Sequence, residues 1–162
     1  MPVITLHTAI NAPAHVVFNL SRSVDLHKIS AAHTTEEAIA GRTSGLMENS
    51  EVVTWQARHF GIRQKLTVQI THMQFAVEFT DAMLPGKGAF KSMVHRHVFE
   101  EHNGRTVMTD IFTYQSPLGI LGRLADVLFL EKYMRRFLTK RNAIIKAFAE
   151  DPARWQQVPG MV

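Results

Sequence analysis

The best candidates for chemistry in this chain are His95 and His97, two histidines separated by a single residue. They lie in a β-rich run over 89–101, where side chains alternate between two faces, so both imidazoles share one face. Asp110 lies in the next β-rich run, 105–115, from which a carboxylate could orient an imidazole across the strands. The period of two does not by itself decide which face points inward.

Several kinds of chemistry are open to this group. Two histidines and an aspartate could ligate a metal, but the short spacing is common by chance, and we expect neither a metal nor another cofactor. A hydrolytic site lacks its nucleophile, because no serine lies in a Gly-x-Ser-x-Gly turn. Acid–base work on a bound ketone and polar lining of a pocket both remain open. The absence of cysteine excludes disulfides and thiolate chemistry.

Composition predicts one domain over 1–162, with a short tail from 151. The chain is 46% hydrophobic and 20% charged, and no stretch resembles a signal peptide or a membrane span, so we expect a soluble cytoplasmic protein. Its charge of +4 is concentrated near the C-terminus, and without interleaved aromatics or a recognition helix we expect no nucleic-acid partner. The oligomeric state is left open. The C-terminal cations are Lys132, Arg135, Arg136, Lys140, Arg141 and Lys146.

Spacing and turn residues predict the elements that carry these side chains. A strand over Val3–Ile10 leads into a helix that Asn11 could cap, and the hydroxyls around 21–23 could cap a second short helix. Phe60-Gly61 and Asn103-Gly104 predict turns between strands, the second being the strongest hairpin signal. The predicted β-rich runs are 50–57, 62–71, 73–81, 89–101 and 105–115. Residues 34–49 could be a strand or a mobile lid.

A long amphipathic helix is predicted over Ile120–Glu150, ended by Asp151-Pro152. Strands followed by a closing helix, without parallel strand–helix alternation, indicate an α+β fold. The predicted inward face comprises Ile120, Val127, Leu130, Met134, Phe137, Leu138, Ile145 and Phe148. Arg141 falls on this apolar side, so it needs a partner: the rim, an internal carboxylate, or an acidic group of a ligand.

Three stretches of the chain resemble the START-like (SRPBCC) superfamily: GLMENSEVVTWQARHFGIRQKLT, GKGAFKSMVHRHVFEE and TDIFTYQSPLGILGRLADVLFLEKYMRRFLTKR. They are most similar to its bacterial polyketide cyclase/dehydrase-like branch. The resemblance implies a helix-grip (Bet v 1-like) fold: a curved antiparallel sheet around the long helix, with two short helices after the first strand. It also implies that Met93, His95, His97 and Phe99 face an internal cavity, and that His27 and Ser30 lie at its entrance.

We therefore expect a protein that binds a hydrophobic or amphiphilic small molecule, such as a lipid, a quinone or an aromatic polyketide-like compound. Aromatic residues are numerous enough to line such a chamber, although they would serve equally well as core. The predicted ligand-binding residues are Trp55, Phe60, Phe75, Phe79, Met93, His95, His97, Phe99, Asp110, Phe112, Tyr114, Val127, Met134, Phe137, Arg141, His27 and Ser30.

Two other functions stay open. The first is a cyclase or dehydratase that uses His95, His97 and Asp110 as acid–base groups, although we expect binding rather than catalysis. The second is an adaptor that contacts a protein, or weakly an anionic membrane, through the basic face of the C-terminal helix.

Overall fold

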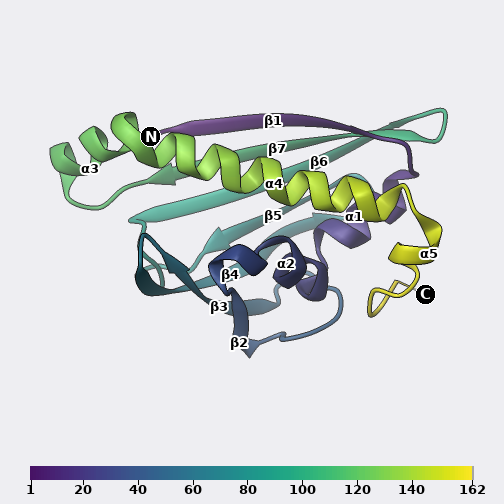
Figure 1. Ribbon diagram of the computed structural model, residues 1–162, viewed down its shortest axis with the longest axis horizontal. Helices are drawn as coiled ribbons and strands as arrows, with labels where there is room; N and C mark the ends of the chain where they lie inside the picture. The colour runs from purple at the N-terminus through teal and green to yellow at the C-terminus, as the bar shows by residue number, and fades with distance from the viewer. Residues whose placement is uncertain (162) are drawn as a thin grey trace.

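The computed structural model describes residues 1–161 and shows an antiparallel sheet that curves around a long C-terminal helix (Figure 1). This is the predicted α+β architecture, including two short helices after the first strand. The elements are β1 (Val3–Ile10), α1 (Ala14–Ser21), α2 (Val24–Ser30), η1 (Ala32–Thr34), β2 (Glu37–Gly41), β3 (Val52–His59), β4 (Ile62–Gln74), β5 (Glu78–Met83), β6 (Ser92–His102), β7 (Arg105–Gln115), α3 (Gly119–Ala125), η2 (Asp126–Leu130), α4 (Glu131–Ala149) and α5 (Pro152–Trp155).

The seven strands follow the order β1-β7-β6-β5-β4-β3-β2, and every neighbouring pair is antiparallel. Consecutive strands pair from β2 to β7, whereas β1 and β2 lie at opposite edges. The chain crosses between those edges through α1 and α2. Figure 1 shows α4 lying across one face of the sheet, with α1 and α2 on the same side.

The predicted hairpin turns are confirmed. Asn103 and Gly104 have φ angles of 52° and 76°, and Phe60 and Gly61 have φ angles of 51° and 74°. Two consecutive left-handed residues match the right-handed twist of the flanking strands, which is why asparagine and glycine signal the first turn clearly.

Two strands differ from the prediction. The expected break after residue 71 lies instead at 75–77, because β4 continues to Gln74 through a register shift between Ile70 and His72, and the predicted run 73–81 is divided between β4 and β5. The ambiguous region 34–49 contains β2, a short edge strand with an irregular pairing between Ala38 and Ala40. That irregularity interrupts the period of two, which is why the sequence pattern was weak there.

The short helices begin where their backbone donors are satisfied. Ser23 caps α2 as predicted, its side chain accepting a hydrogen bond from the Leu26 amide. The predicted cap of the first helix is wrong, because α1 starts after Pro13 without a side-chain cap. The backbone N–H of Asn11 instead donates to Glu150 Oε1 at 2.8 Å. The N-terminal strand is thereby tied to the end of α4.

The C-terminal helix contains a π-helical turn, η2, that the sequence did not predict. A π turn inserts extra backbone and changes the direction in which preceding side chains point. Leu138 and Ile145 in α4 are buried as predicted, but Ile120 and Val127 are 83% and 76% exposed, so their inward placement was wrong.

The core lies between the sheet and the helices. Phe18 of α1 is fully buried, and its ring makes edge contacts with Phe75, Phe79 and Phe99 at centroid distances of 5.4–5.5 Å. This cluster fills the space below α1. Over residues 1–161, no helix combines the length and the apolar composition needed to cross a membrane.

Candidate functional site

A cavity of about 410 Å³ lies between the sheet and α4. That volume falls within the range of small-molecule binding pockets, about 300–1,000 Å³. Most of its wall is apolar, and α2, α3 and α4 contribute to it together with the central strands. Apolar wall residues on the strands include Val53, Trp55, Leu66, Val68, Ile70, Phe79, Met93 and Phe112.

Most residues that the sequence singled out as ligand-binding line this cavity. They come from α2, from the strands β3, β5, β6 and β7, from the β3–β4 turn, and from α4. They are His27, Trp55, Phe60, Phe79, Met93, His95, His97, Phe112, Met134, Phe137 and Arg141. Their role in binding stays a prediction, but their side chains line one cavity.

Two of the predicted residues lie on the surface, so their placement in the cavity was wrong. Phe75, in the turn after β4, is 61% exposed because the strand runs beyond its predicted end. Val127 points outward because the π turn changes the direction of its side chain.

Four further predicted residues are buried beside the cavity rather than on its wall, a second correction. Phe99 packs against Phe18 and Phe79, and Tyr114 packs against Phe90 and Phe112. The Ser30 hydroxyl donates to the His27 carbonyl within its own helix. Asp110 is completely buried behind the histidines. Alternation along a strand gives the face of each side chain, but not its depth in the interior.

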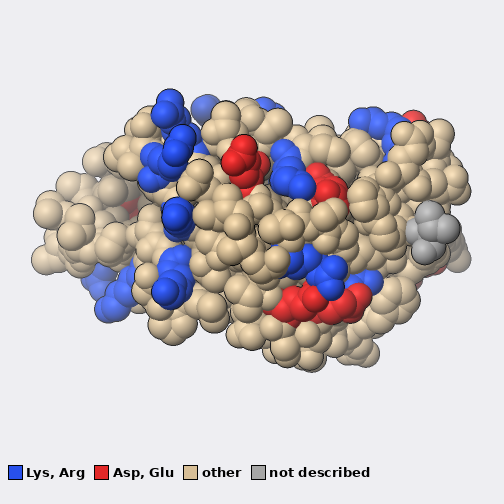
Figure 2. Space-filling view, turned by 90° about the horizontal axis from the view of Figure 1, so that it is seen from below, with Lys and Arg blue, Asp and Glu red and all other residues tan. Residues whose placement is uncertain are grey.

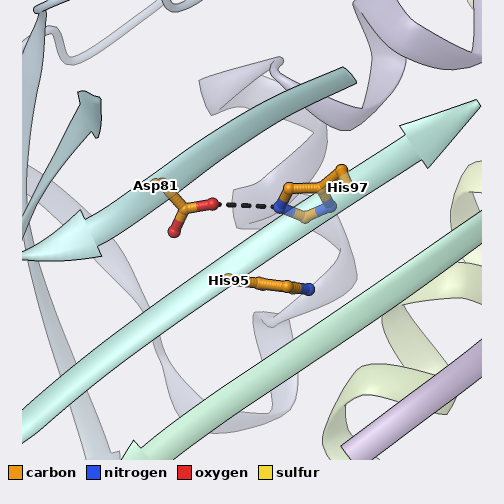
Figure 3. Close-up of side chains that lie close together, drawn as sticks. All are labelled: Asp81, His95 and His97. Carbon is orange, nitrogen blue, oxygen red and sulfur yellow. Dashed lines mark hydrogen bonds and ion pairs between the residues drawn. The ribbon is translucent and has the colours of Figure 1, made fainter. Parts of the chain in front are cut away.

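A polar cluster lies in the cavity wall, built from facing positions of β5, β6 and β7. The strand register sets His95 opposite Asp81 on one side, and His97 opposite Asp110 on the other. His95 Nε2 lies 2.9 Å from Asp110 Oδ1, and His97 Nε2 lies 2.9 Å from Asp81 Oδ1. Figure 3 shows the His97–Asp81 hydrogen bond and the two imidazole rings side by side on β6, with centroids 3.8 Å apart.

Asp110 is the centre of this cluster. Besides His95, its Oδ1 contacts His97 Nδ1 at 2.9 Å, an ion pair rather than an aligned hydrogen bond. Asn142 Nδ2, from α4, donates to Oδ2 at 2.6 Å, and Arg141 Nη1 lies 3.6 Å from Oδ1. The long helix is therefore linked to the sheet through one buried carboxylate.

Arg141 finds its partners inside the protein. Its Nη2 donates to the Ser21 carbonyl at 2.9 Å, in addition to the ion pair with Asp110. Of the alternatives left open for this residue, the structure shows the internal pair.

Burial and hydrogen bonding shift the pKa values of the two histidines in opposite directions. Burial, reinforced by the neighbouring His97, lowers the pKa of His95 to about 4, so His95 is neutral at pH 7. Burial also disfavours protonated His97, but its contacts with Asp110 and Asp81 outweigh that effect and raise its pKa. For Asp110 burial alone would raise the pKa, yet the contacts with both histidines hold it well below the usual value.

The raised pKa of His97 favours its protonated form, and protonation of His97 together with Arg141 offsets the buried carboxylates of Asp81 and Asp110. Because His95 Nε2 must donate its proton to Asp110, the other nitrogen, Nδ1, carries a lone pair. Among residues 1–161 that Nδ1 has no hydrogen-bond partner, and His95 lines the cavity. It is a hydrogen-bond acceptor available to a ligand.

Asp81, His95 and His97 could also be considered as metal ligands, since one donor atom from each lies within 4.8 Å of the others. The donor set resembles two-histidine-one-carboxylate metal sites. A cation there would have to displace the proton shared by His97 and Asp81 and would meet the nearby positive charge of Arg141. The arrangement therefore favours the hydrogen-bonded network over a bound cation.

A second polar group lies on the cavity wall, and His27 is the one member of it that the sequence singled out. Glu36 Oε1 lies 3.2 Å from His27 Nε2, and His59 Nδ1 lies 2.6 Å from the Tyr133 hydroxyl. The contact with His27 outweighs the effect of burial and lowers the pKa of Glu36. Glu36 precedes the irregular strand β2, where no periodic signal placed it.

Asp81 and Asn142 are the other functional candidates that sequence reasoning missed. Asp81 lies on β5 in register with His95, but the loop 84–91 between the two strands is too long for the sequence to indicate which residues pair. Asn142 directly follows Arg141, on the buried side of α4, and a polar residue there was the only signal available.

No protein-family model matches the chain, and no curated protein matches it in sequence. Solved structures do match. The aromatase/cyclase Zhui from a Streptomyces species superposes with a TM-score of 0.71 at 15% identity, covering 97% of this chain and 98% of that one. Protein TTHA0849 from Thermus thermophilus superposes with a TM-score of 0.69 at 18% identity, covering 90% of this chain and 98% of that one.

A plant protein matches equally widely. Major latex-like protein 151 from Panax ginseng gives a TM-score of 0.66 at 16% identity, covering 93% of this chain and 98% of that one. At such identities the likeness concerns the fold alone. Together with the curved seven-stranded sheet, the two short helices and the long helix across the cavity, it identifies the chain as a protein with the helix-grip (Bet v 1-like) fold.

Proposed function

We propose that this protein binds a small molecule with an apolar body and one neutral polar end in the cavity between the sheet and α4. The observation that carries the proposal is an apolar cavity of about 410 Å³ with an unpaired hydrogen-bond acceptor, His95 Nδ1, in its wall beside the polar cluster. Apolar walls with a few convergent polar groups are typical of ligand sites. A lipid, a quinone derivative or an aromatic compound has suitable chemistry.

The polar cluster defines which polar end fits. Neutral His95 can accept a hydrogen bond from a hydroxyl group of the ligand, whereas two carboxylates at the same place disfavour an anionic end. Arg141 is balanced within the network and is not free for a ligand carboxylate. We therefore expect an alcohol, a phenol or an enol rather than a fatty acid.

Cyclase or dehydratase activity is the second candidate, supported by the neutral imidazole at the cavity wall. Binding is favoured because a general base works best when its pKa lies near the working pH, and the pKa of His95 is about 4. Both nitrogens of His97 face carboxylates, those of Asp81 and Asp110, so this residue has no proton directed at a ligand. The fold also occurs in an aromatase/cyclase, which keeps this candidate open to test.

The first experiment is native mass spectrometry of the purified protein, followed by extraction and identification of whatever it retains. We expect a hydroxyl-bearing apolar compound. A compound so identified, mixed with the protein at neutral pH, should be released unchanged; conversion to a cyclised or dehydrated product would support the enzyme instead.

A cavity-filling variant provides the matched test. Ala57 is buried on β3 and lines the cavity, whereas Ala143 lies on the exposed face of α4. Ala57→Phe should abolish binding of an apolar fluorescent probe while the protein stays folded by circular dichroism, and Ala143→Phe should bind the probe like the wild type. Equal binding by all three proteins would contradict a site in this cavity.

A further inference from the structure

One end of the molecule carries a concentration of exposed apolar side chains. They lie on α3, on η2 and on the turn between β3 and β4, and their exposure ranges from 49% to 83%. We call this set the apolar tip: Phe60, Ile62, Leu118, Ile120, Leu121, Leu124, Val127, Leu128 and Phe129. A patch of this kind is unusual on a protein surface that faces only water.

The members of the apolar tip form one surface. The Phe60 ring lies 5.6 Å from Phe129 and 4.6 Å from Tyr133, measured between ring centroids, so the hairpin turn touches the helix. Figure 1 shows α3 at the same end as the N-terminus, where β7 ends. Nothing among residues 1–161 covers these side chains.

The apolar tip also surrounds the mouth of the cavity. Phe60, Leu118, Leu121 and Phe129 belong to both the exposed set and the cavity wall. A molecule that covers the apolar tip therefore also covers the route into the cavity.

The charges beside the apolar tip are mostly basic, and the carboxylate that lies beside Ile120 and Val127, Glu131, is paired with Arg135. In the segments 58–65, 84–91 and 118–130 the one acidic residue is Asp126, which is buried and bonded to Ser116. Figure 2 shows the end that carries α3 largely free of charged side chains, with a band of Lys and Arg next to it. The exposed basic residues of these segments are Arg58, Arg63, Lys65, Lys87, Lys91 and Arg123.

An apolar centre with basic surroundings fits one partner best. Apolar side chains enter the outer part of a bilayer, and basic side chains beside them contact anionic headgroups. A second copy of this chain fits poorly, because joining two apolar tips would bring both basic sets together.

We propose that the apolar tip docks on the surface of an anionic lipid bilayer, with the mouth of the cavity facing the membrane. An apolar ligand could then pass between bilayer and cavity without crossing water. That passage rests on the proposed ligand binding, whereas the docking itself does not. This contact surface differs from the one expected from the sequence. That surface was the basic face of the C-terminal helix, whereas the surface proposed here is defined by the exposed apolar residues of the apolar tip.

Co-sedimentation of the ligand-free protein with phosphatidylcholine vesicles, with and without phosphatidylglycerol, tests the docking. We expect binding to the anionic vesicles that weakens as salt increases, and little binding to the neutral ones. Failure to sediment with anionic vesicles at low salt overturns the proposal, and so does equal binding to both vesicle types.

Two pairs of variants locate the contact. Val127→Glu in the apolar tip should weaken vesicle binding at least fivefold, whereas Val77→Glu, an exposed valine beyond the other end of β4, should not. Loss of one basic contact with an anionic membrane weakens binding about fivefold, so Arg63→Glu should weaken vesicle binding by at least that factor. Arg105→Glu, in the distant β6–β7 hairpin, should have little effect. Equal effects within either pair overturn the assignment of the surface, as does a stable dimer that Val127→Glu dissociates.

Ligand binding in solution is measured separately. Val127 does not line the cavity, so Val127→Glu should keep wild-type affinity for the fluorescent probe in solution and take it up more slowly from anionic vesicles. Vesicle docking without any probe binding would support the membrane surface and reject the proposed function; probe binding without docking would do the reverse.

Discussion

Asp110 shows at the scale of single residues why the polar cluster is both stable and selective. A buried carboxylate is costly unless every oxygen is paired, and here two histidines, an asparagine and an arginine surround it. The same contacts fix the tautomer of His95. The acceptor offered to the cavity is therefore a consequence of the network that holds α4 to the sheet.

Substitution of Asn142 should lower the stability of the protein. In Asn142→Leu, Asp110 Oδ2 loses its 2.6 Å donor and stays buried, which should lower the free energy of unfolding by about 2–3 kcal/mol. Urea denaturation measures the change. The neighbouring Ala143→Leu, on the exposed face of α4, is the control and should change stability by less than about 0.5 kcal/mol. Similar losses in both variants would contradict the role given to Asn142.

The two histidines predict a stability maximum near pH 6.5. His95 has a pKa of about 4 when folded, against 6.5 in the unfolded chain, so acidification between these values protonates only the unfolded state and destabilises the fold. The full difference is on the order of 3 kcal/mol. His97 acts in the opposite direction: its raised pKa stabilises the fold below pH 6.5, and that contribution is lost as pH rises through the raised value.

Denaturation at pH 6.5 and pH 4.5 checks this prediction. Burial also lowers the pKa of His59, which adds to the loss in acid, so the contribution of His95 is isolated by substitution. His95→Phe should lose less stability than the wild type over this interval, and the exposed His15→Phe is the matched control for loss of an imidazole. The same loss in all three proteins would mean that His95 does not titrate as described.

Sequence reasoning identified His95, His97 and Asp110 because a strand places alternate residues on one face. It missed Asp81 and Asn142 because their positions depend on the register between strands and on how α4 lies on the sheet. The sequence pattern also does not show how deeply a side chain is buried. Phe99 and Phe112 alternate in the same way on neighbouring strands, yet Phe99 belongs to the core and Phe112 to the cavity wall.

At the scale of elements, the junction between β7 and α4 determines the shape of the cavity mouth. Leu118 has a φ angle of 67°, uncommon for leucine, and η2 interrupts the α-helical hydrogen bonds before α4 begins. Gly122 lies against the Pro117 carbonyl so closely that no side chain fits between them. Small size, not conformational freedom, is what this glycine contributes.

Gly122→Ala should therefore displace α3. The added methyl group would meet the Pro117 backbone, which is not a flexible side-chain end, so the helix must move away from the strand end. We expect a wider cavity mouth and faster release of a bound probe, with α4 and the sheet unchanged. Stopped-flow displacement measures the release rate, and a rate equal to that of the wild type would show that α3 accommodates the methyl group in place.

Most elements could be predicted because their signals are local. Turn residues fixed the ends of β3, β6 and β7, and Ser23 marked the start of α2. The π turn could not be predicted, because an uninterrupted helix accounts equally well for the same apolar spacing. Its effect was to reverse the expected direction of Ile120 and Val127.

At the scale of the whole molecule, the cavity links stability to ligand binding. A ligand that binds only the folded state raises the free energy of unfolding, by about 2.7 kcal/mol at a hundred times its dissociation constant. Protein stripped of retained compounds by unfolding and refolding should consequently melt at a lower temperature than protein as purified. Adding back the extracted compound should restore the original midpoint. An unchanged midpoint would indicate that nothing stabilising had been bound.

The residue types alone did not predict the cavity. Trp55, Phe79 and Phe112 would fill an ordinary core equally well, and only the curvature of the sheet across α4 holds them apart. The resemblance to helix-grip proteins implied the cavity; the distribution of apolar and polar residues did not.

The strand order has a consequence for how the molecule assembles. β1 pairs with β7, joining Val3 to Thr113 and Ile10 to Thr106, so the first strand is fixed only after nearly all of the sheet sequence has been synthesised. Hairpins from β2 to β7 can form locally, but the β1 edge requires closure of a loop of about a hundred residues. On the ribosome, the N-terminal strand must wait unpaired while α1 and α2 emerge. We expect slow folding, in the range of milliseconds to seconds, with docking of β1 among its last steps.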